Sequence, residues 1–153
     1  MRAPSLLKSK NSVVVIDSNF ILLPFQFKID YFNEVRLKLE GKLKFIIFQQ
    51  ILNELDAKKR RESKATKFAS FLESGLLYLE KNKEKYDIEI MEDIKNDNET
   101  TDDFILRLSV KLKNVGQTVY IATNDSELRK KAKRIRIGII FLRQKKYLSF
   151  ERA

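Results

Sequence analysis

The chain has 153 residues, 43% of them apolar, which suits one hydrophobic core and therefore a single domain over residues 1–153. It contains neither cysteine nor histidine, which excludes disulfides, thiolate or imidazole catalysis and zinc sites built from those residues. The 31 Lys and Arg against 21 Asp and Glu give a net charge of +10, which favours a polyanionic partner over a neutral metabolite.

Short apolar runs alternate with longer helical patterns along the chain. A basic N-terminal extension covers 1–11, and a basic C-terminal tail covers 143–153. Between them, strands are predicted near 12–17, 43–48, 86–91, 118–123 and 137–142. Helices are predicted near 28–40, 49–57, 63–83, 100–116 and 125–134. This alternation indicates an α/β protein with three α/β/α layers and a central, mostly parallel five-stranded sheet.

No stretch approaches the roughly 18 consecutive apolar residues of a membrane span. The basic N-terminus also lacks the apolar centre of a signal peptide. We therefore expect a cytoplasmic protein with no membrane partner.

Acidic residues follow the predicted strands or begin the helices after them. Asp17 directly follows Val13–Ile16, and Asp125 follows the apolar run that ends at Asn124. Glu54 and Asp103 lie near the starts of predicted helices. In a parallel sheet these positions meet at one edge, where ligands bind. Four converging carboxylates repel one another and favour a divalent ion such as Mg²⁺ or Mn²⁺, which would orient a phosphodiester for hydrolysis.

Each of these acids except Asp17 also has an ordinary structural interpretation. The spacings Thr100–Asp103 and Asn124–Glu127 are typical of helix caps. Glu54 could pair with Lys58 one helical turn later. An acid that ends a fully apolar strand has no comparable explanation, so Asp17 is the firmest candidate.

Basic residues gather in two regions that could bind RNA phosphates. One follows Glu54, and the other contains ten bases and a single acid between Arg129 and Arg152. The predicted RNA-binding residues are Lys58, Arg60, Arg61, Arg129, Lys130, Arg143, Lys145 and Lys146. Tyr147 and Phe150 could stack on unpaired bases or, alternatively, pin the tail to the core.

Four segments resemble, in order, the motifs of the PIN domain family. They are Val13–Phe20, Ile51–Leu55, Thr101–Ile105 and Ala122–Leu128, and the resemblance spans roughly residues 12–149. It is strongest to the archaeal branch near rRNA-processing nucleases and VapC toxins. The resemblance implies a PIN-like metal-dependent endoribonuclease that uses Mg²⁺ or Mn²⁺, acts on RNA and forms a homodimer. An antitoxin or a ribosome-assembly protein is the implied partner, according to the role.

By position, the resemblance implies as catalytic and metal-binding residues Asp17, Glu54, Asp103 and Asp125. Asn19 and Thr123 match supporting polar positions. Asp102 competes with Asp103, and Asp103 is preferred because the family's ligand directly precedes an apolar helical run. The first motif reads Asp-Ser-Asn where the family more often has Asp-Thr-Asn, which retains the hydroxyl.

Other functional classes fit the sequence less well. It contains no G-x-G-x-x-G or G-x-x-x-x-G-K-[ST] loop for nucleotide phosphates. A dehalogenase-type phosphatase would need an aspartate where Asn19 stands, and a receiver domain would need one that ends the third strand. The main alternative is a catalytically inactive PIN-like scaffold that binds RNA in ribosome biogenesis. The presence of all four acids argues against it.

Overall fold

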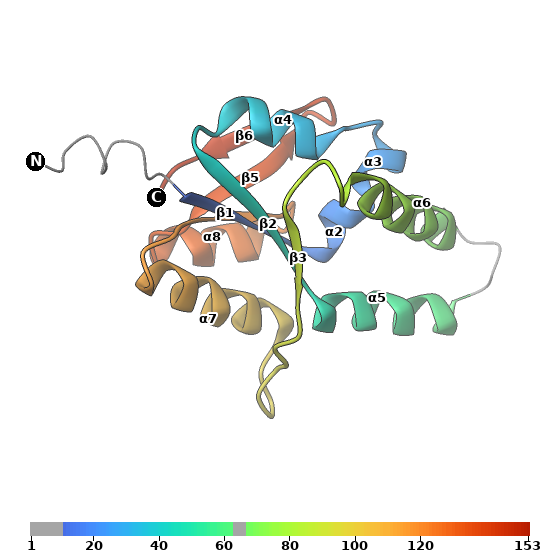
Figure 1. Cartoon of the computed structure of the whole chain (residues 1–153). Coiled ribbons are helices and arrows are strands. Elements are labelled where there is room, and N and C mark those ends of the chain that lie inside the picture. The colour runs from blue at the N-terminus through green and yellow to red at the C-terminus, as the bar shows by residue number, and fades with distance from the viewer. Residues whose placement is uncertain (1–10, 63–66) are drawn as a thin grey trace, which may run out of the picture.

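The computed structural model describes residues 11–62 and 67–153, so the predicted basic extension, apart from Asn11, lies outside the described residues. Six strands form one sheet in the order β3-β2-β1-β4-β5-β6 (Figure 1). They are β1 (Asn11–Ile16), β2 (Lys42–Phe48), β3 (Ile88–Met91), β4 (Thr118–Ala122), β5 (Gly138–Arg143) and β6 (Tyr147–Glu151). All pairs are parallel except β5 with β6. The predicted α/β/α fold with a mostly parallel sheet is confirmed, with one strand more than expected.

Helices cover both faces of the sheet. The elements are α2 (Ser18–Ile21), α3 (Leu23–Gln26), α4 (Tyr31–Lys38), α5 (Gln49–Arg61), α6 (Lys67–Asn82), α7 (Thr101–Asn114) and α8 (Ser126–Arg134). Right-handed crossovers place α2 to α6 on one side, and α7 and α8 pack against β4 and β5 on the other (Figure 1). The predicted helices are all found, although the start predicted for α6 lies in 63–66, outside the described residues.

The sequence of β1 explains its central position. Val13 to Ile16 are almost completely buried, as expected for a parallel strand covered on both faces. On the α4 side, aromatic rings fill the interface: Phe32 lies 4.6 Å from Phe45 and 5.1 Å from Tyr78, measured between ring centroids. This packing holds the helices against the sheet. Polar side chains that could bind a ligand therefore lie at the ends of the strands.

The chain reverses its winding direction beside β1. After β1 it moves through β2 to β3, and α7 then carries it back to β4, on the other side of β1. The carboxyl ends of β1 and β4 therefore form a topological switch point, the usual ligand crevice of open α/β sheets. Asp17 extends the pairing there, since its amide donates to the carbonyl of Ala122 at 3.0 Å.

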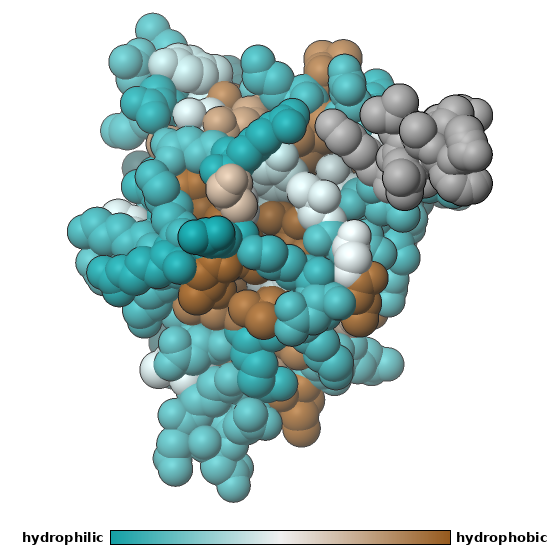
Figure 2. All heavy atoms as spheres, turned by 90° about the vertical axis from the view of Figure 1, so that its left-hand side faces the viewer, coloured by the Kyte–Doolittle hydropathy of each residue, from teal (hydrophilic) through white to brown (hydrophobic). Residues whose placement is uncertain are grey.

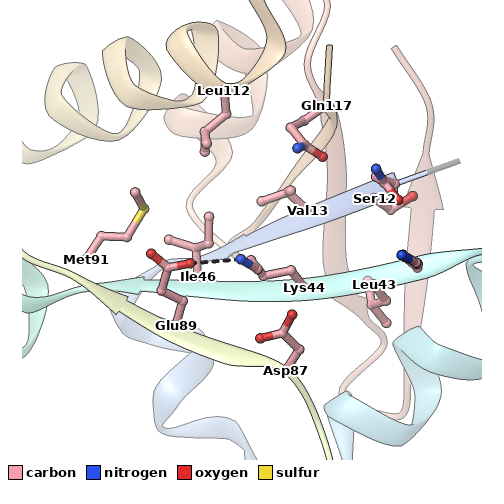
Figure 3. A pocket seen from close by; sticks show the side chains of 12 residues that line it. Ser12, Val13, Leu43, Lys44, Ile46, Asp87, Glu89, Met91, Leu112 and Gln117 are labelled. Atoms are coloured by element: carbon pink, nitrogen blue, oxygen red, sulfur yellow. Dashed lines mark hydrogen bonds and ion pairs between the residues drawn. The ribbon is translucent and has the colours of Figure 1, made fainter. Parts of the chain in front are cut away.

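A second hollow lies away from that edge, toward the starts of β1 and β2. Its volume is about 270 Å³, and Val13, Met91 and Leu112 contribute apolar walls (Figure 3). The ion pair between Lys44 and Glu89, at 2.9 Å, crosses it. The molecular face on the left of Figure 1 is mainly hydrophilic, with apolar patches between charged side chains (Figure 2). None of the four predicted acids lines this hollow.

None of the helices within 11–62 and 67–153 combines the length and apolarity needed to cross a bilayer.

Candidate active site

Asp17 is buried where β1 ends, with only 5% of its surface exposed. Its Oδ1 accepts a hydrogen bond from the amide of Ser18 at 2.8 Å, and its Oδ2 accepts one from the Thr123 hydroxyl at 2.6 Å. Burial raises the pKa of the carboxyl, and these two hydrogen bonds offset only part of the rise. The nearby charges of Asp102 and Asp125 raise it further. A charged Asp17 is therefore costly unless a cation is present.

Polar side chains tie three strand ends together around Asp17. The Asn19 amide donates to Asp17 Oδ2 at 3.2 Å and to the Thr123 hydroxyl at 3.3 Å. The Asn19 carbonyl accepts from the backbone amide of Asn124 at 2.9 Å, and Asn124 Oδ1 accepts from the amide of Leu142 at 2.8 Å. The ends of β1, β4 and β5 are thus held in one register, which supports the predicted roles of Asn19 and Thr123 as positioning residues.

Asp125 begins α8 and serves as its N-cap. Its Oδ1 accepts from the amides of Glu127, at 2.8 Å, and Leu128, at 3.2 Å. The predicted cap is therefore present, but Asp125 rather than Asn124 provides it. Both capping bonds end on Oδ1, so among the described residues Oδ2 is left without a hydrogen bond. One oxygen of Asp125 can thus stabilise the helix while the other faces a ligand.

Two neighbouring aspartates at the start of α7, Asp102 and Asp103, are the candidates for the third acidic residue of the site, and their environments differ. Burial raises the pKa of Asp102, and the charge of Asp125 raises it further. The Asp103 side chain is 57% exposed and lies 3.8 Å from the ammonium of Lys131. Its backbone amide donates to the Thr100 hydroxyl at 3.1 Å, which confirms the predicted cap. The sequence favoured Asp103, which lies beside Lys131 of α8. Asp102 and Asp125 instead carry charges that raise the pKa of Asp17, so Asp102 is the alternative that the electrostatics favour.

Glu54 lies on α5 with a complete set of protein partners. Its Oε1 accepts from the Thr101 hydroxyl at 2.7 Å. Its Oε2 accepts from Gln50 at 2.9 Å and pairs with the Lys95 ammonium at 3.1 Å. Burial acts to raise the pKa of Glu54, but hydrogen bonds from Thr101, Gln50 and Lys95 outweigh it and lower the pKa. Glu54 therefore contacts the start of α7 through Thr101, but the ammonium of Lys95 already balances its charge.

The alternative interpretation of Glu54, an ion pair with Lys58, is not observed; Glu54 pairs with Lys95. The Lys58 ammonium lies 4.4 Å from the centroid of the Phe68 ring instead. Lys95 was missed as a functional residue, although it is the only base between Asp87 and Asp103. A lone base within an acidic segment is a signal that could have identified it. Thr101 carries no comparable signal.

The predicted RNA-binding residues fall into two separate groups. Lys58, Arg60 and Arg61 end α5, where Arg60 pairs with Asp56 at 2.9 Å. The second group begins with Arg129 and Lys130 on α8 and continues with Arg143 at the end of β5. Lys145 and Lys146 lie in the turn that connects β5 to β6. Only the second group lies along the strand ends that carry Asp17 and Asp125.

Oxygen ligands from Asp17, Asp102 and Asp125 suit a hard divalent ion. Within the part of the chain that the structure describes, no three carboxylates are yet close enough to hold an ion together. The pKa values of Asp17 and Asp102 are nevertheless raised, first by burial and then by the neighbouring acids. The donor chemistry therefore fits a divalent cation that would draw the carboxylates together.

Comparisons with known proteins bear on the family and the fold of this chain. Residues 14–145 match a family described as "PIN like domain". Ribonuclease VapC4 of Methanocaldococcus jannaschii is 28% identical over 137 residues, which cover 88% of this chain and 92% of that protein. The solved structure of the PIN domain endonuclease Utp24 aligns with a TM-score of 0.65 and 24% identity, over 92% of each chain. The structural likeness supports the fold observed here.

Proposed function

Because the chain belongs to the PIN-like domain family, we propose that it is a metal-dependent endoribonuclease that hydrolyses RNA phosphodiester bonds. The observation that carries the proposal is the buried carboxyl of Asp17, whose pKa is raised by burial and by Asp102 and Asp125. Within the described residues, the hydrogen bonds to this carboxyl come only from neutral donors, so no cation of the chain pairs with it there. The name of the relative VapC4, a ribonuclease, supports the choice of RNA as substrate.

Asp17, Asp102 and Asp125 are the residues that would hold Mg²⁺ or Mn²⁺. When bound, such an ion polarises a phosphoryl oxygen and lowers the pKa of water, which supplies the chemistry of hydrolysis. Glu54 is assigned to the outer side of the site because Lys95 already balances its charge at 3.1 Å. Asp103 is proposed only as the helix-start residue that pairs with Lys131.

The other side chains orient these acids and bind the substrate. Thr123 and Asn19 fix the rotamer of Asp17 through hydrogen bonds to Oδ2. Arg129 and Arg143, at the same sheet edge, supply positive charge for the RNA backbone. The chain's excess of basic residues would also concentrate RNA near the acids.

Two cellular roles are compatible with this chemistry. One is cleavage during rRNA processing with a ribosome-assembly partner, and the other is a VapC-type toxin held by an antitoxin. Both are proposed for a cytoplasmic homodimer. The catalytically inactive RNA-binding scaffold is kept as a second candidate, because no three carboxylates within the described residues form a ready ion site.

The test compares the wild type with Asp17→Asn on labelled single-stranded and structured RNA, with Mg²⁺ or Mn²⁺. We expect cleavage to fall roughly a thousand-fold or more, because a central ligand is lost, while RNA binding is kept or tightened. Asp97→Asn, the same change at an exposed loop position, is the matched control and should cleave normally. Equal RNA binding with no cleavage by any of the proteins would instead support the scaffold.

A further inference from the structure

The β5–β6 hairpin carries an unusual set of side chains on the face next to α8. Its register places Phe141 opposite Ser149 and Arg143 opposite Tyr147. Residues directly opposite each other on antiparallel strands project from the same face. Arg129 of α8 lies over this face, with its guanidinium carbon 4.2 Å from the centroid of the Phe141 ring. Two arginines and two aromatic residues therefore share one surface, which we call the hairpin face.

The two arginines of the hairpin face are held on one ring. The Arg143 guanidinium lies 5.1 Å from the Phe141 centroid, close to the 4.2 Å of Arg129. Arg129 Nε is buried and has no hydrogen-bond partner within the described residues. The neighbouring anion is Glu151, which already pairs with Lys133 at 2.9 Å. Two guanidinium groups therefore lie near a carboxylate that is already paired, which leaves them able to bind a further anion.

Tyr147 differs from the other aromatic residue of the strand. Phe150 points to the opposite face and packs against the core, so it provides the anchor expected for the C-terminal tail. Tyr147 is 45% exposed and takes part in no ring contact within the described ranges. It therefore lies opposite Arg143 as an open aromatic surface. Such rings stack on unpaired bases, whereas the bases of a duplex are already stacked.

The hairpin face borders the acidic site. The amide of Leu142 donates to Asn124 Oδ1 at 2.8 Å, which joins the end of β5 to the segment that carries Asp125. The amide of Arg129 donates to the carbonyl of Asp125 at 3.0 Å, so the two residues are about 6 Å apart along the axis of α8. An RNA phosphate bound by the two arginines would therefore be next to the phosphodiester bond that is held at the acidic site.

We propose that Arg129, Arg143 and Tyr147 form a subsite for one unpaired RNA nucleotide beside the scissile bond. The arginines bind its phosphate, and the ring of Tyr147 stacks on its base. This rests on the proposed endoribonuclease function and deepens it by naming the residues that contact the nucleotide beside the cleaved bond. It also assigns Tyr147, which lies outside the acidic site, as a residue that selects for unpaired strands.

The test measures binding rather than cleavage, so that its failure differs from a failure of the nuclease proposal. Fluorescence anisotropy with chelator present gives the Kd of a labelled, unstructured RNA and of a duplex of the same length. We expect Tyr147→Ala to weaken binding of the single strand by about tenfold or more, and Tyr147→Phe to retain it. Duplex binding should stay within about twofold for both variants.

Arginine variants test the phosphate contact independently. Arg143→Gln should weaken single-strand binding and reduce the salt dependence of log Kd by about 0.7, the contribution of one phosphate contact on a single strand. Arg36→Gln on α4, in the opposite layer, is the matched control and should leave both values unchanged. Thermal melting confirms that each variant is folded.

Three results would overturn the proposal. They are unchanged single-strand binding by Tyr147→Ala, equal losses for single strand and duplex, and an Arg143→Gln salt dependence equal to that of the wild type. An acidic protein segment as the true occupant would give the first of these. If the variants behave as expected but Asp17 proves irrelevant to cleavage, the subsite stands as an RNA-binding site and only the nuclease proposal fails.

Discussion

Asp17 and Asp102 differ from Glu54, at the same edge of the sheet, in the charges that surround them. Asp17 and Asp102 have raised pKa values, caused first by burial and then by neighbouring acids. Within the described residues, Asp102 makes no hydrogen bond or close ion pair. Glu54, by contrast, has a lowered pKa and three donors, including the ammonium of Lys95. Asp17 and Asp102 would need a cation from outside the chain, whereas Glu54 is already paired with Lys95.

This difference separates carboxylates that can bind a metal ion from one that stabilises the fold. A buried charge without a partner costs free energy, and proteins retain such charges mainly where they serve function. Glu54 connects α5 to the start of α7 through Thr101 and to the segment after β3 through Lys95. We therefore expect Glu54 to help position Asp102, and Asp102 to act directly.

The largest effect expected from this comparison is on cleavage. Asp102→Asn should lower the rate about a hundred-fold or more, because it removes a ligand charge next to Asp17 and Asp125. Glu54→Gln should lower it by less than about tenfold, because the amide can still accept from Thr101. Single-turnover rates at saturating Mn²⁺ measure both changes.

Asp103→Asn is the matched control for Asp102→Asn, since it makes the same change at the next position of α7. It should retain activity within about threefold, because its side chain is exposed and faces Lys131. A large loss for Asp103→Asn with normal activity for Asp102→Asn would return the third ligand position to Asp103.

A smaller effect is expected on metal affinity when Lys95 is removed. Lys95→Met leaves the Glu54 carboxylate without its counter-charge at the acidic edge, so Mn²⁺ should bind about fivefold more tightly by calorimetry. Lys111→Met, on the exposed face of α7, should leave the affinity unchanged. Weaker binding by Lys95→Met would mean that Lys95 mainly holds the segment after β3 in place.

The smallest effect concerns stability and pH. The folded-state pKa of Asp102 is raised above its ordinary value of 3.8, so its unfavourable charge is absent at low pH and appears as pH rises through the folded pKa. In chelator, Asp102→Asn should therefore melt a few degrees above the wild type near pH 7, and the gap should close toward about pH 4.

Mn²⁺ should reverse that order, because it binds the folded wild type more tightly than the variant. Calorimetric melting at both pH values, with chelator and with Mn²⁺, measures the four cases. A variant that melts below the wild type in chelator near pH 7 would show that Asp102 is not repelled by its neighbours.

Most of the fold could be predicted from hydrophobic periodicity. The five parallel strands and the longer helices have clear patterns of buried residues, and each was found close to its expected position. Helices α2 and α3 have only four residues each, too few to show a helical period. Pro24 lies in the first turn of α3, where its missing amide costs nothing.

Strand β6 was missed because its turn has an unusual sequence. Residues 144–146 form the turn, and in it Gln144 and Lys145 adopt positive φ angles of 54° and 56°. Asn and Gly usually occupy such positions, so the basic composition from Arg143 onward indicated a tail rather than a hairpin. The stability of β6 comes from pairing with β5 and from Leu148 and Phe150, which are packed into the core.

The location of the proposed site follows from the sequence, whereas the choice of every residue in it does not. An acid at the end of a buried strand identified Asp17, and the strand–helix order placed Asp125 beside it. The choice between Asp102 and Asp103 depended on a rotation of about 100° around the start of α7, which the sequence does not fix. The contact of Lys95 with Glu54 spans 41 positions and depends on tertiary packing.

The central claim is that Asp17, Asp102 and Asp125 bind one divalent ion at the end of β1. Anomalous diffraction from a crystal soaked in Mn²⁺ tests it most directly. We expect a peak bounded by these three carboxylates, with Glu54 still paired to Lys95 or in contact only through water. A peak centred on Asp103 and Lys131, at the Lys44–Glu89 hollow, or at no carboxylate of this edge would contradict it.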